Sequence, residues 1–267
     1  HDGSGTTLVQ PWVRAPLKVQ RPFYPEGPEI CHSVLLHTAG GVVGGDRLSI
    51  QLQLQPQARA LITTAAASKL YRTNGLQAQQ AVQVEVAEGA CLEWLPQETI
   101  VFDRAHYRQT MQIDLAPGAT WLGWDITRFG RTAKGERFTS GEWRSHTEVW
   151  QAGNPLWVDR QWLPGSEELI NSPHGLAGCG VVGSFAFLGQ SVEPELVEKA
   201  RQLWTGEGEV GVTRLRSGSA SSGESGLLCR YRGNSTSEVR YWFTAVWHLI
   251  RVSFLGQSAC IPRVWGV

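Results

Sequence analysis

The sequence predicts an all-β, β-helix-like fold, in which strands stack as in a solenoid and only a few short α-helices accompany them. Apolar and polar residues alternate with period two along segments 48–54, 82–86 and 111–115, a pattern typical of strands with one buried face. Charged residues make up only 18% of the 267 residues and 30 residues are glycine, a composition that disfavours helical bundles and coiled coils.

Each alternating segment leads into a tight turn and a second strand, and these units recur along the chain. The turns end at Ala58, Ala90 and Ala119, so the units are spaced by 32 and then by 29 residues. A looser fourth unit covers residues 147–158 around Gly153, about 35 residues further on. Strand–turn–strand repeats of this length predict stacked layers. A meandering β-sandwich built from similar hairpins is the alternative.

Helical patterns are few and short. A proline at the first turn and apolar residues at helical spacing predict a helix over 194–204, and a second is predicted over 243–254, closed by Gly256. A short helix is also expected over 65–71, after two threonines. The Ser/Gly-rich segment 217–226 is predicted to be a mobile loop.

Composition and charge exclude several classes of function. The 24 basic and 24 acidic side chains give no net charge, which argues against a broad cationic face for nucleic acid or an anionic membrane. The five cysteines form no C-x-x-C pair, so reduced thiols in a cytoplasmic protein are expected rather than disulfides or structural zinc. The most apolar stretch, 178–189, is too short and glycine-rich to span a bilayer. No other break in composition divides residues 1–267, which predicts a single domain.

The glycine-rich segment 39–46 is the sharpest local motif. Its spacing matches neither the G-x-G-x-x-G fingerprint nor a P-loop, because Asp46 stands where a P-loop has lysine. Two hypotheses remain for Asp46: it caps a glycine-rich turn, or it belongs to a binding site. The histidines form no H-x-x-H pattern and no G-x-S-x-G elbow is present, which disfavours a tight catalytic metal centre and a serine nucleophile of that type.

Charged residues also stand within apolar segments. Glu93 and Glu98 lie among apolar residues in 92–100, and paired acids beside tryptophans are what glycoside hydrolysis uses. Lys69 and Arg72, three residues apart, fit either a grip on the carboxylates of a partner or a solvated surface.

Further acids lie near glycines in the middle of the chain. Asp125, Glu136 and Asp159 lie where strand ends could bring carboxylates together in a layered fold. Structural ion pairs between these acids and Arg131 or Arg160 are the alternative.

Taken together, these segments resemble one family, the urease accessory proteins UreD, called UreH in some organisms. The matching segments follow one another in order across nearly the whole chain; they are 37–46, 61–64, 68–72, 92–100, Asp125, 130–131, 135–136, 246–247, Arg251 and 262–265. The chain differs from the family pattern in two places: the usual N-terminal strand is shortened or lost, and Ser68 stands where threonine is common.

The resemblance implies a β-helix-like, non-catalytic protein that helps to insert nickel into apo-urease. It implies that the chain binds the urease structural subunits and the accessory protein UreF, is dimeric within the accessory complex through UreF, and meets the GTPase UreG through UreF. In this family Ni²⁺ is thought to pass transiently through a water-filled internal tunnel to the urease active site, with no tightly bound cofactor.

A conduit for Ni²⁺ needs ligands that replace part of the ion's hydration and still release it, as carboxylates, carbonyls and water do better than a cage of cysteine and histidine. We therefore expect no tight structural metal site, and a nickel path lined or flanked by six carboxylates: Asp46, Asp125, Glu136, Asp159, Glu93 and Glu98. Partner binding is expected at a second set of residues: Lys69, Tyr71, Arg72, Arg131, Trp247, Arg251, Arg263 and Trp265. The UreF contact is expected among residues 247–265 and on the helix 194–204. A β-helix carbohydrate-active enzyme with paired carboxylates remains the alternative function.

Overall fold

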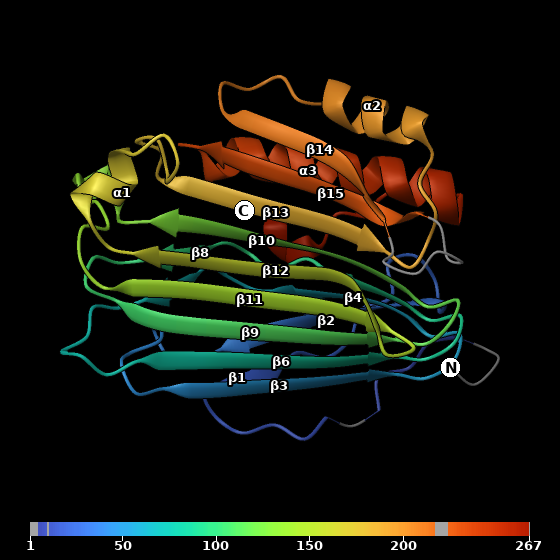
Figure 1. Ribbon diagram of the computed structural model, residues 1–267. Helices are drawn as coiled ribbons and strands as arrows, with labels where there is room; N and C mark the ends of the chain where they lie inside the picture. Colours follow the sequence, from blue (N-terminus) through green and yellow to red (C-terminus); the bar gives the residue numbers. More distant parts are fainter. Residues whose placement is uncertain (1–4, 10, 217–223, 267) are drawn as a thin grey trace.

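The computed structural model describes residues 5–9, 11–216 and 224–266, which form two stacked β-sheets with helices on one outer face (Figure 1). The strands are β1 (Leu17–Val19), β2 (Ile30–His37), β3 (Arg47–Leu54), β4 (Arg59–Thr64), β5 (Ser68–Leu70), β6 (Ala78–Val86), β7 (Cys91–Trp94), β8 (Thr99–Val101), β9 (His106–Leu115), β10 (Thr120–Phe129), β11 (Glu142–Gln151), β12 (Asn154–Pro164), β13 (Val181–Leu188), β14 (Glu209–Arg216) and β15 (Glu224–Gly233). The α-helices are α1 (Glu167–Asn171), α2 (Pro194–Gln202) and α3 (Thr236–Ile250); short 3-10 turns occupy Thr132–Lys134 and Arg263–Trp265.

Within these ranges the larger sheet has ten strands and the smaller sheet five. The larger sheet runs in the order β1-β2-β4-β7-β10-β13-β15-β14. Off this path, β8 pairs with β10, and β5 pairs with β8. The smaller sheet runs in the order β12-β11-β9-β6-β3.

The first half of the chain coils between the two sheets and confirms the predicted solenoid-like arrangement. Parallel pairing aligns Arg59 with Cys91 and Cys91 with Thr120, offsets of 32 and 29 residues that equal the repeat read from the sequence. Ala58, Ala90 and Ala119 stand just before these strands, where the chain crosses from one sheet to the other, and all three are buried among apolar side chains.

The fourth unit, 147–158, is not a further coil, and this part of the prediction is wrong. Strands β11 and β12 pair antiparallel within the smaller sheet and are joined by Ala152 and Gly153, both with positive φ (49° and 77°). A two-residue turn of this kind reverses a strand inside its own sheet, whereas the earlier turns carry the chain to the other sheet. Strand β13 then pairs antiparallel with β10, so the coiling stops after β11.

The helices predicted at 194–204 and 243–254 are confirmed as α2 and α3, although their observed bounds differ from the predicted ones. Helix α3 begins seven residues earlier than expected because Ser235 caps it, accepting a hydrogen bond from the backbone N–H of Glu238 at 3.1 Å. A π-helical turn over Arg251–Leu255 follows, and Gly256 with φ 64° ends it as predicted.

The helix expected over 65–71 is wrong, since Ser68–Leu70 form β5 and pair in parallel with β8. Within the predicted loop 217–226, residues 217–223 lie outside the described part of the chain, and residues 224–226 begin β15.

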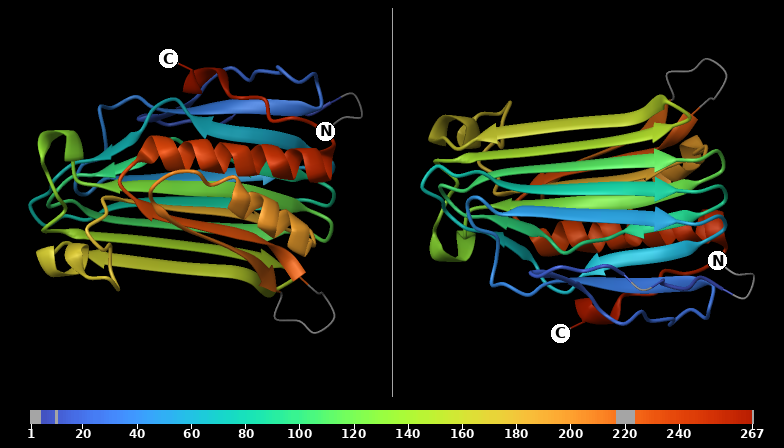
Figure 2. Two further views of the ribbon diagram at one scale, coloured as in Figure 1. Left: turned by 90° about the horizontal axis from the view of Figure 1, so that it is seen from above. Right: turned by 90° about the horizontal axis from the view of Figure 1, so that it is seen from below.

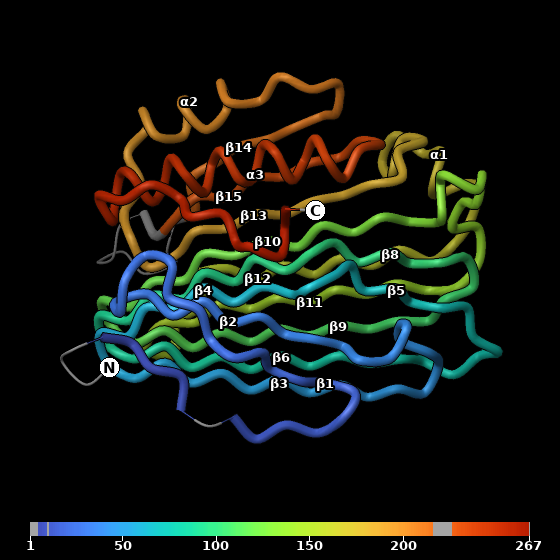
Figure 3. The backbone as a smooth tube through the Cα atoms, turned by 180° about the vertical axis from the view of Figure 1, so that it is seen from behind, coloured from blue at the N-terminus to red at the C-terminus, as the bar shows by residue number. Residues whose placement is uncertain are grey.

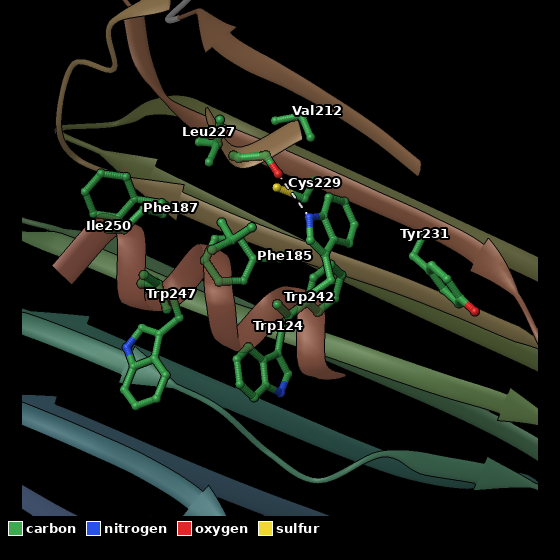
Figure 4. Close-up of a cluster of buried hydrophobic side chains, with 14 of the residues drawn as sticks. Trp124, Phe185, Phe187, Val212, Leu227, Cys229, Tyr231, Trp242, Trp247 and Ile250 are labelled. Atoms are coloured by element: carbon green, nitrogen blue, oxygen red, sulfur yellow. Dashed lines mark hydrogen bonds between the residues drawn. The ribbon is translucent and has the colours of Figure 1, made fainter. Parts of the chain in front are cut away.

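Helices α2 and α3 cover the outer face of the larger sheet (Figure 2). Their core contains Trp124 and Phe185 from the sheet and Trp242 and Trp247 from α3 (Figure 4). The indole of Trp242 donates a hydrogen bond to the Ala200 carbonyl at 3.0 Å and so joins the two helices. The residues after α3 turn back along the helix, as seen from behind in Figure 3.

Two further apolar clusters lie between the sheets, one toward each end of the strands. The first contains residues from the crossing turns and the adjoining strand ends, among them Val84, Ile113, Trp121, Val149 and Leu188. The second contains residues from the opposite strand ends, among them Leu48, Leu70, Tyr107, Phe129 and Trp143. Along β9, β10 and β11 the inward-facing residues between these clusters are polar, and there the candidate site lies.

Candidate functional site

A layer of polar side chains crosses the interior between the two apolar clusters. Backbone register places three members side by side in each sheet: Asp125, Ser184 and Arg230 in the larger sheet and Gln109, Ser145 and Gln161 in the smaller one. Because inward-facing positions recur every second residue, Asp159, two residues before Gln161, faces the same side and also belongs to the polar layer.

Hydrogen bonds join the two halves of this polar layer. The Gln109 amide donates to the carboxylate of Asp125 and to the hydroxyl of Ser145, the latter at 2.8 Å. The Gln161 amide donates to Asp159 Oδ2 at 2.7 Å and to the hydroxyl of Ser184 at 3.3 Å. The sheets are therefore held together here by amide–carboxylate and amide–hydroxyl contacts instead of apolar packing.

The polar layer opens onto a cavity of about 340 Å³ between the sheets. The cavity exists because small residues line part of it, among them Gly123, Ser145 and Ser184. A Cβ at Gly123 would lie 2.5 Å from the indole of Trp121, so even alanine does not fit there without displacing that ring. Asp125 and Asp159 both line the cavity, which brings together two of the six expected carboxylates.

The two aspartates of the cavity differ in whether a cation is bound to them. Burial, reinforced by the negative charge of Asp159, raises the pKa of Asp125 from 3.8 to about 6, while hydrogen bonds from Gln109 and Thr127 oppose this rise. Asp159 instead forms an ion pair with Arg230, whose Nη2 lies 2.7 Å from Oδ1. When Asp125 is ionised, two carboxylates therefore face one guanidinium, and the polar layer carries one excess negative charge.

His37 is a cavity residue that the sequence did not single out as a site residue. Its Nδ1 lies 3.2 Å from the carbonyl oxygen of Ala39, and because that oxygen can only accept, Nδ1 carries the proton. In the neutral ring Nε2 then holds a lone pair; this buried nitrogen has no hydrogen-bond partner among the described residues, and His37 lines the cavity. A nitrogen of this kind is a suitable ligand for Ni²⁺.

Asp46 and Glu136 lie outside the cavity lining. The Asp46 carboxylate accepts a hydrogen bond from the backbone N–H of Val43 at 2.9 Å, which is the geometry of a turn cap. Glu136 forms an ion pair with Arg131, and hydrogen bonds from this guanidinium lower the pKa of Glu136. Asp46 therefore caps a turn and Glu136 forms a structural ion pair, which are the alternatives that the sequence left open for these two residues.

Glu93 faces the opposite side of the larger sheet, under α3. It accepts a hydrogen bond from the Trp247 indole at 3.1 Å and lies 3.1 Å from Nε of Arg251. Arg251 also pairs with Glu26 at 2.8 Å, and Glu26 contacts His32 at 2.7 Å. We call Glu26, His32, Glu93 and Arg251 the sealed ion cluster, because every member has a side chain no more than 11% exposed.

Glu98, the sixth expected carboxylate, pairs with Arg240 on α3. The acids therefore occupy separate places, with only Asp125 and Asp159 on the cavity. Glu93 and Glu98 are each bound to an arginine, and six of the twelve tryptophans are buried, while only Trp12 and Trp162 are largely exposed. Glu93 and Glu98, the two acids that suggested glycoside hydrolysis in the sequence, therefore do not line the cavity.

The expected partner-binding residues are also dispersed. Four of them are exposed: Lys69, Arg72, Arg131 and Arg263. Tyr71 and Arg131 both pack on the ring of Phe102, and Trp265 is partly buried against Trp124, with ring centroids 5.3 Å apart. Trp247 and Arg251 are fully buried and present no surface to a partner in this structure.

The described ranges of the chain contain no group of three or more His, Cys, Asp or Glu side chains placed to hold a metal ion. In the same ranges, no helix combines the length and apolar character needed to cross a membrane. All five cysteines are free. Fold and site together define a solenoid-like β protein with helices on one outer face and an acid-lined cavity between its sheets.

Comparison with known proteins identifies the family within that class. A family model described as UreD urease accessory protein matches residues 1–266. The urease accessory protein UreD of Nostoc punctiforme is 64% identical over 262 residues, covering 98% of this chain and 91% of the relative. Those of Acaryochloris marina and of a Synechocystis strain are 59% and 44% identical, covering 97% and 93% of this chain and 90% of each relative. The chain belongs to the UreD family of urease accessory proteins, as its motifs indicate.

Proposed function

We propose that the chain is a non-catalytic scaffold in urease maturation, and that Ni²⁺ passes through its interior cavity on the way to the urease active site. One observation carries this proposal in a protein of the UreD family: a cavity of about 340 Å³ that is lined by two carboxylates and lies between the sheets. We place the step in the cytoplasm, in a complex with apo-urease, with UreF and, through UreF, with UreG. The complex contains two copies of the chain, joined through UreF.

The chemistry of the cavity suits a divalent cation in transit. The polar layer offers carboxylate, amide and hydroxyl oxygens, which bind Ni²⁺ less tightly than thiolates do. With a pKa of about 6, Asp125 is mostly ionised at neutral pH, yet a proton competes with the metal as the pH falls. A path needs ligands of this weakness, because an ion that is bound too firmly does not leave.

Partner binding is assigned to the exposed members of the expected set. Lys69 lies both at the surface and on the cavity lining, so a partner that covers it would also cover an opening of the cavity. Residues 247–265 and α2 are the proposed UreF contact; Val252 and Ile261 are about half exposed in that region and supply apolar surface.

Co-expression with the urease subunits, UreF and UreG, followed by affinity purification, sizing and metal analysis, tests this function. The chain should co-purify with urease and UreF, and Asp125→Asn should leave that complex assembled while urease nickel content falls severalfold. Asp114→Asn is the matched control, because Asp114 is exposed on the outer face of the smaller sheet. Equal nickel content in both variants would contradict the path, and failure to bind urease would contradict the scaffold.

A further inference from the structure

Arg230 on β15 holds Asp159 on β12 in a two-pronged ion pair. Arg230 Nη2 lies 2.7 Å from Asp159 Oδ1, and Nη1 lies 2.9 Å from Oδ2. Gln161 donates a further hydrogen bond to Oδ2 at 2.7 Å. Both oxygens of the Asp159 carboxylate are therefore occupied by donors of the protein itself, although this residue lines the cavity.

The guanidinium of Arg230 has room to leave this position. Its side chain is 38% exposed, whereas that of Asp159 is only 13% exposed. Arg230 is also held by a hydrogen bond from Nη1 to Ser184 Oγ at 2.6 Å and lies 5.8 Å from the ring centre of Trp157. Movement of the guanidinium toward solvent would free Asp159 without moving either sheet.

Charge balance gives this movement a consequence for a cation in the cavity. With Arg230 in place, a divalent cation meets one uncompensated carboxylate, that of Asp125. With Arg230 displaced, it meets two carboxylates and is fully neutralised. An arginine stays protonated at every physiological pH, so it competes with the metal continuously, unlike a histidine or a lysine with a lowered pKa.

We propose that Arg230 is a built-in competitor of the transported cation, which keeps Asp159 an intermittent ligand and so keeps the cavity from trapping the ion. This inference rests on the proposed nickel path and deepens it by naming the residue that sets how weakly the ion is held. Arg230 acts through Asp159 and is a positioning residue; it does not touch the metal.

The test measures Ni²⁺ affinity of the purified full-length chain by competition with a chromophoric chelator. Arg230→Gln removes the competing charge and should bind Ni²⁺ at least about tenfold more tightly than the unmodified chain. Arg160→Gln is the matched control: Arg160 precedes Gln161 on the same strand, but its side chain is 73% exposed and contacts Glu148. It should leave the affinity unchanged.

The double variant Arg230→Gln/Asp159→Asn separates this role from a structural one. If the gain comes from the freed Asp159, the double variant should return to the affinity of the unmodified chain. Unchanged or weaker binding by Arg230→Gln, or tight binding that persists in the double variant, would overturn the inference. Should Arg230→Gln not fold, Arg230→Lys, which keeps a point charge but loses the two-pronged contact, must bind at least about threefold tighter. Equal affinity would then contradict the role of Arg230.

Failure of the underlying nickel path gives a different result. In that case Asp125→Asn would not weaken Ni²⁺ binding at all. If Asp125→Asn weakens binding and Arg230→Gln leaves it unchanged, the path stands and only the competitor role falls.

Discussion

The sealed ion cluster and the polar layer of the cavity both place two carboxylates beside one arginine, but in opposite surroundings. In the cluster Arg251 is 1% exposed and is bound by Glu26 and Glu93. In the cavity Arg230 is 38% exposed and, within the described ranges, forms an ion pair with one carboxylate, that of Asp159, while Asp125 is held by neutral donors. The same three charges thus form a closed unit in one place and an open one in the other.

The pKa shifts of Glu26 and Asp125 reflect this difference, although burial raises the pKa of Glu93 despite its arginine partner. Although burial alone would raise it, hydrogen bonds from His32 and Arg251 lower the pKa of Glu26. No cation among the described residues contacts Asp125, and burial raises its pKa to about 6. Buried charges that are paired with an opposite charge fix a structure, whereas a charge held only by neutral groups is available for another cation. We therefore assign the cluster to stability and the layer to transport.

The largest expected effect comes from breaking the sealed ion cluster. Arg251→Met leaves Glu93 and Glu26 buried without their guanidinium and should lower the free energy of unfolding by about 3–5 kcal/mol. The loss should shrink at pH 5, because burial already raises the pKa of Glu93 and removal of the arginine raises it further, so that this carboxyl takes up a proton. Urea unfolding at pH 7 and at pH 5 measures the free energy of unfolding of the variant and of the unmodified chain.

Arg263→Met is the control for this prediction, since Arg263 is exposed and the change there should cost less than about 0.5 kcal/mol. The double variant Glu93→Leu/Arg251→Met should recover part of the loss, because two apolar side chains need no charge partner. If Arg251→Met costs no more than Arg263→Met, the cluster does not have the stabilising role assigned to it.

Much of the fold could be predicted because it depends on local signals. Period-two alternation and the spacing of Ala58, Ala90 and Ala119 predicted the coils, and Pro194 predicted the start of α2. The pairing of 68–70 with β8 and the reversal at 152–153 could not be predicted in the same way. Those features depend on which strand lies alongside, and a three-residue strand carries too little pattern to specify its partner.

The candidate site was predictable only in its single residues. Asp125 and Asp159 were expected on the path, but their approach depends on β12 folding back along β11, where a further coil had been expected. Gln109 and His37 were missed, and a polar residue at an inward position between Tyr107 and Met111 was the available signal for the first. Arg230 lies 71 residues beyond Asp159 and could be placed only by the sheet register.

An intermediate effect is expected from Asp125→Asn in the absence of metal. The folded-state pKa of about 6 lies above the ordinary value of 3.8, so ionising Asp125 costs stability as the pH rises through this interval. That cost is no more than about 3 kcal/mol. Because a neutral asparagine oxygen accepts a weaker hydrogen bond from Gln109 than a carboxylate does, the net gain of the variant is reduced to about 1–2 kcal/mol at pH 7.

Thermal unfolding from pH 4 to pH 7.5 checks this expectation. The two proteins should melt together near pH 4, where Asp125 is protonated, and Asp125→Asn should melt higher above pH 6. Asp114→Asn should follow the unmodified chain throughout. A variant that is less stable at pH 7 would show that the open carboxylate is a structural element like Glu93, and the contrast between the two regions would fail.

The smallest effect is expected from Gln109→Met, which keeps the length of the side chain but removes the donor to Asp125. Hydrogen bonding from Gln109 lowers the pKa of Asp125, so its loss should move this pKa above 6 and lower stability at pH 7 by about 1 kcal/mol. Gln112→Met, at an exposed position on the same strand, should change neither quantity. A carbon-13 titration of the Asp125 carboxyl measures the pKa directly. An unchanged value would mean that the Gln109 amide does not stabilise the ionised form, and that the excess negative charge offered to a cation is held by other groups of the layer.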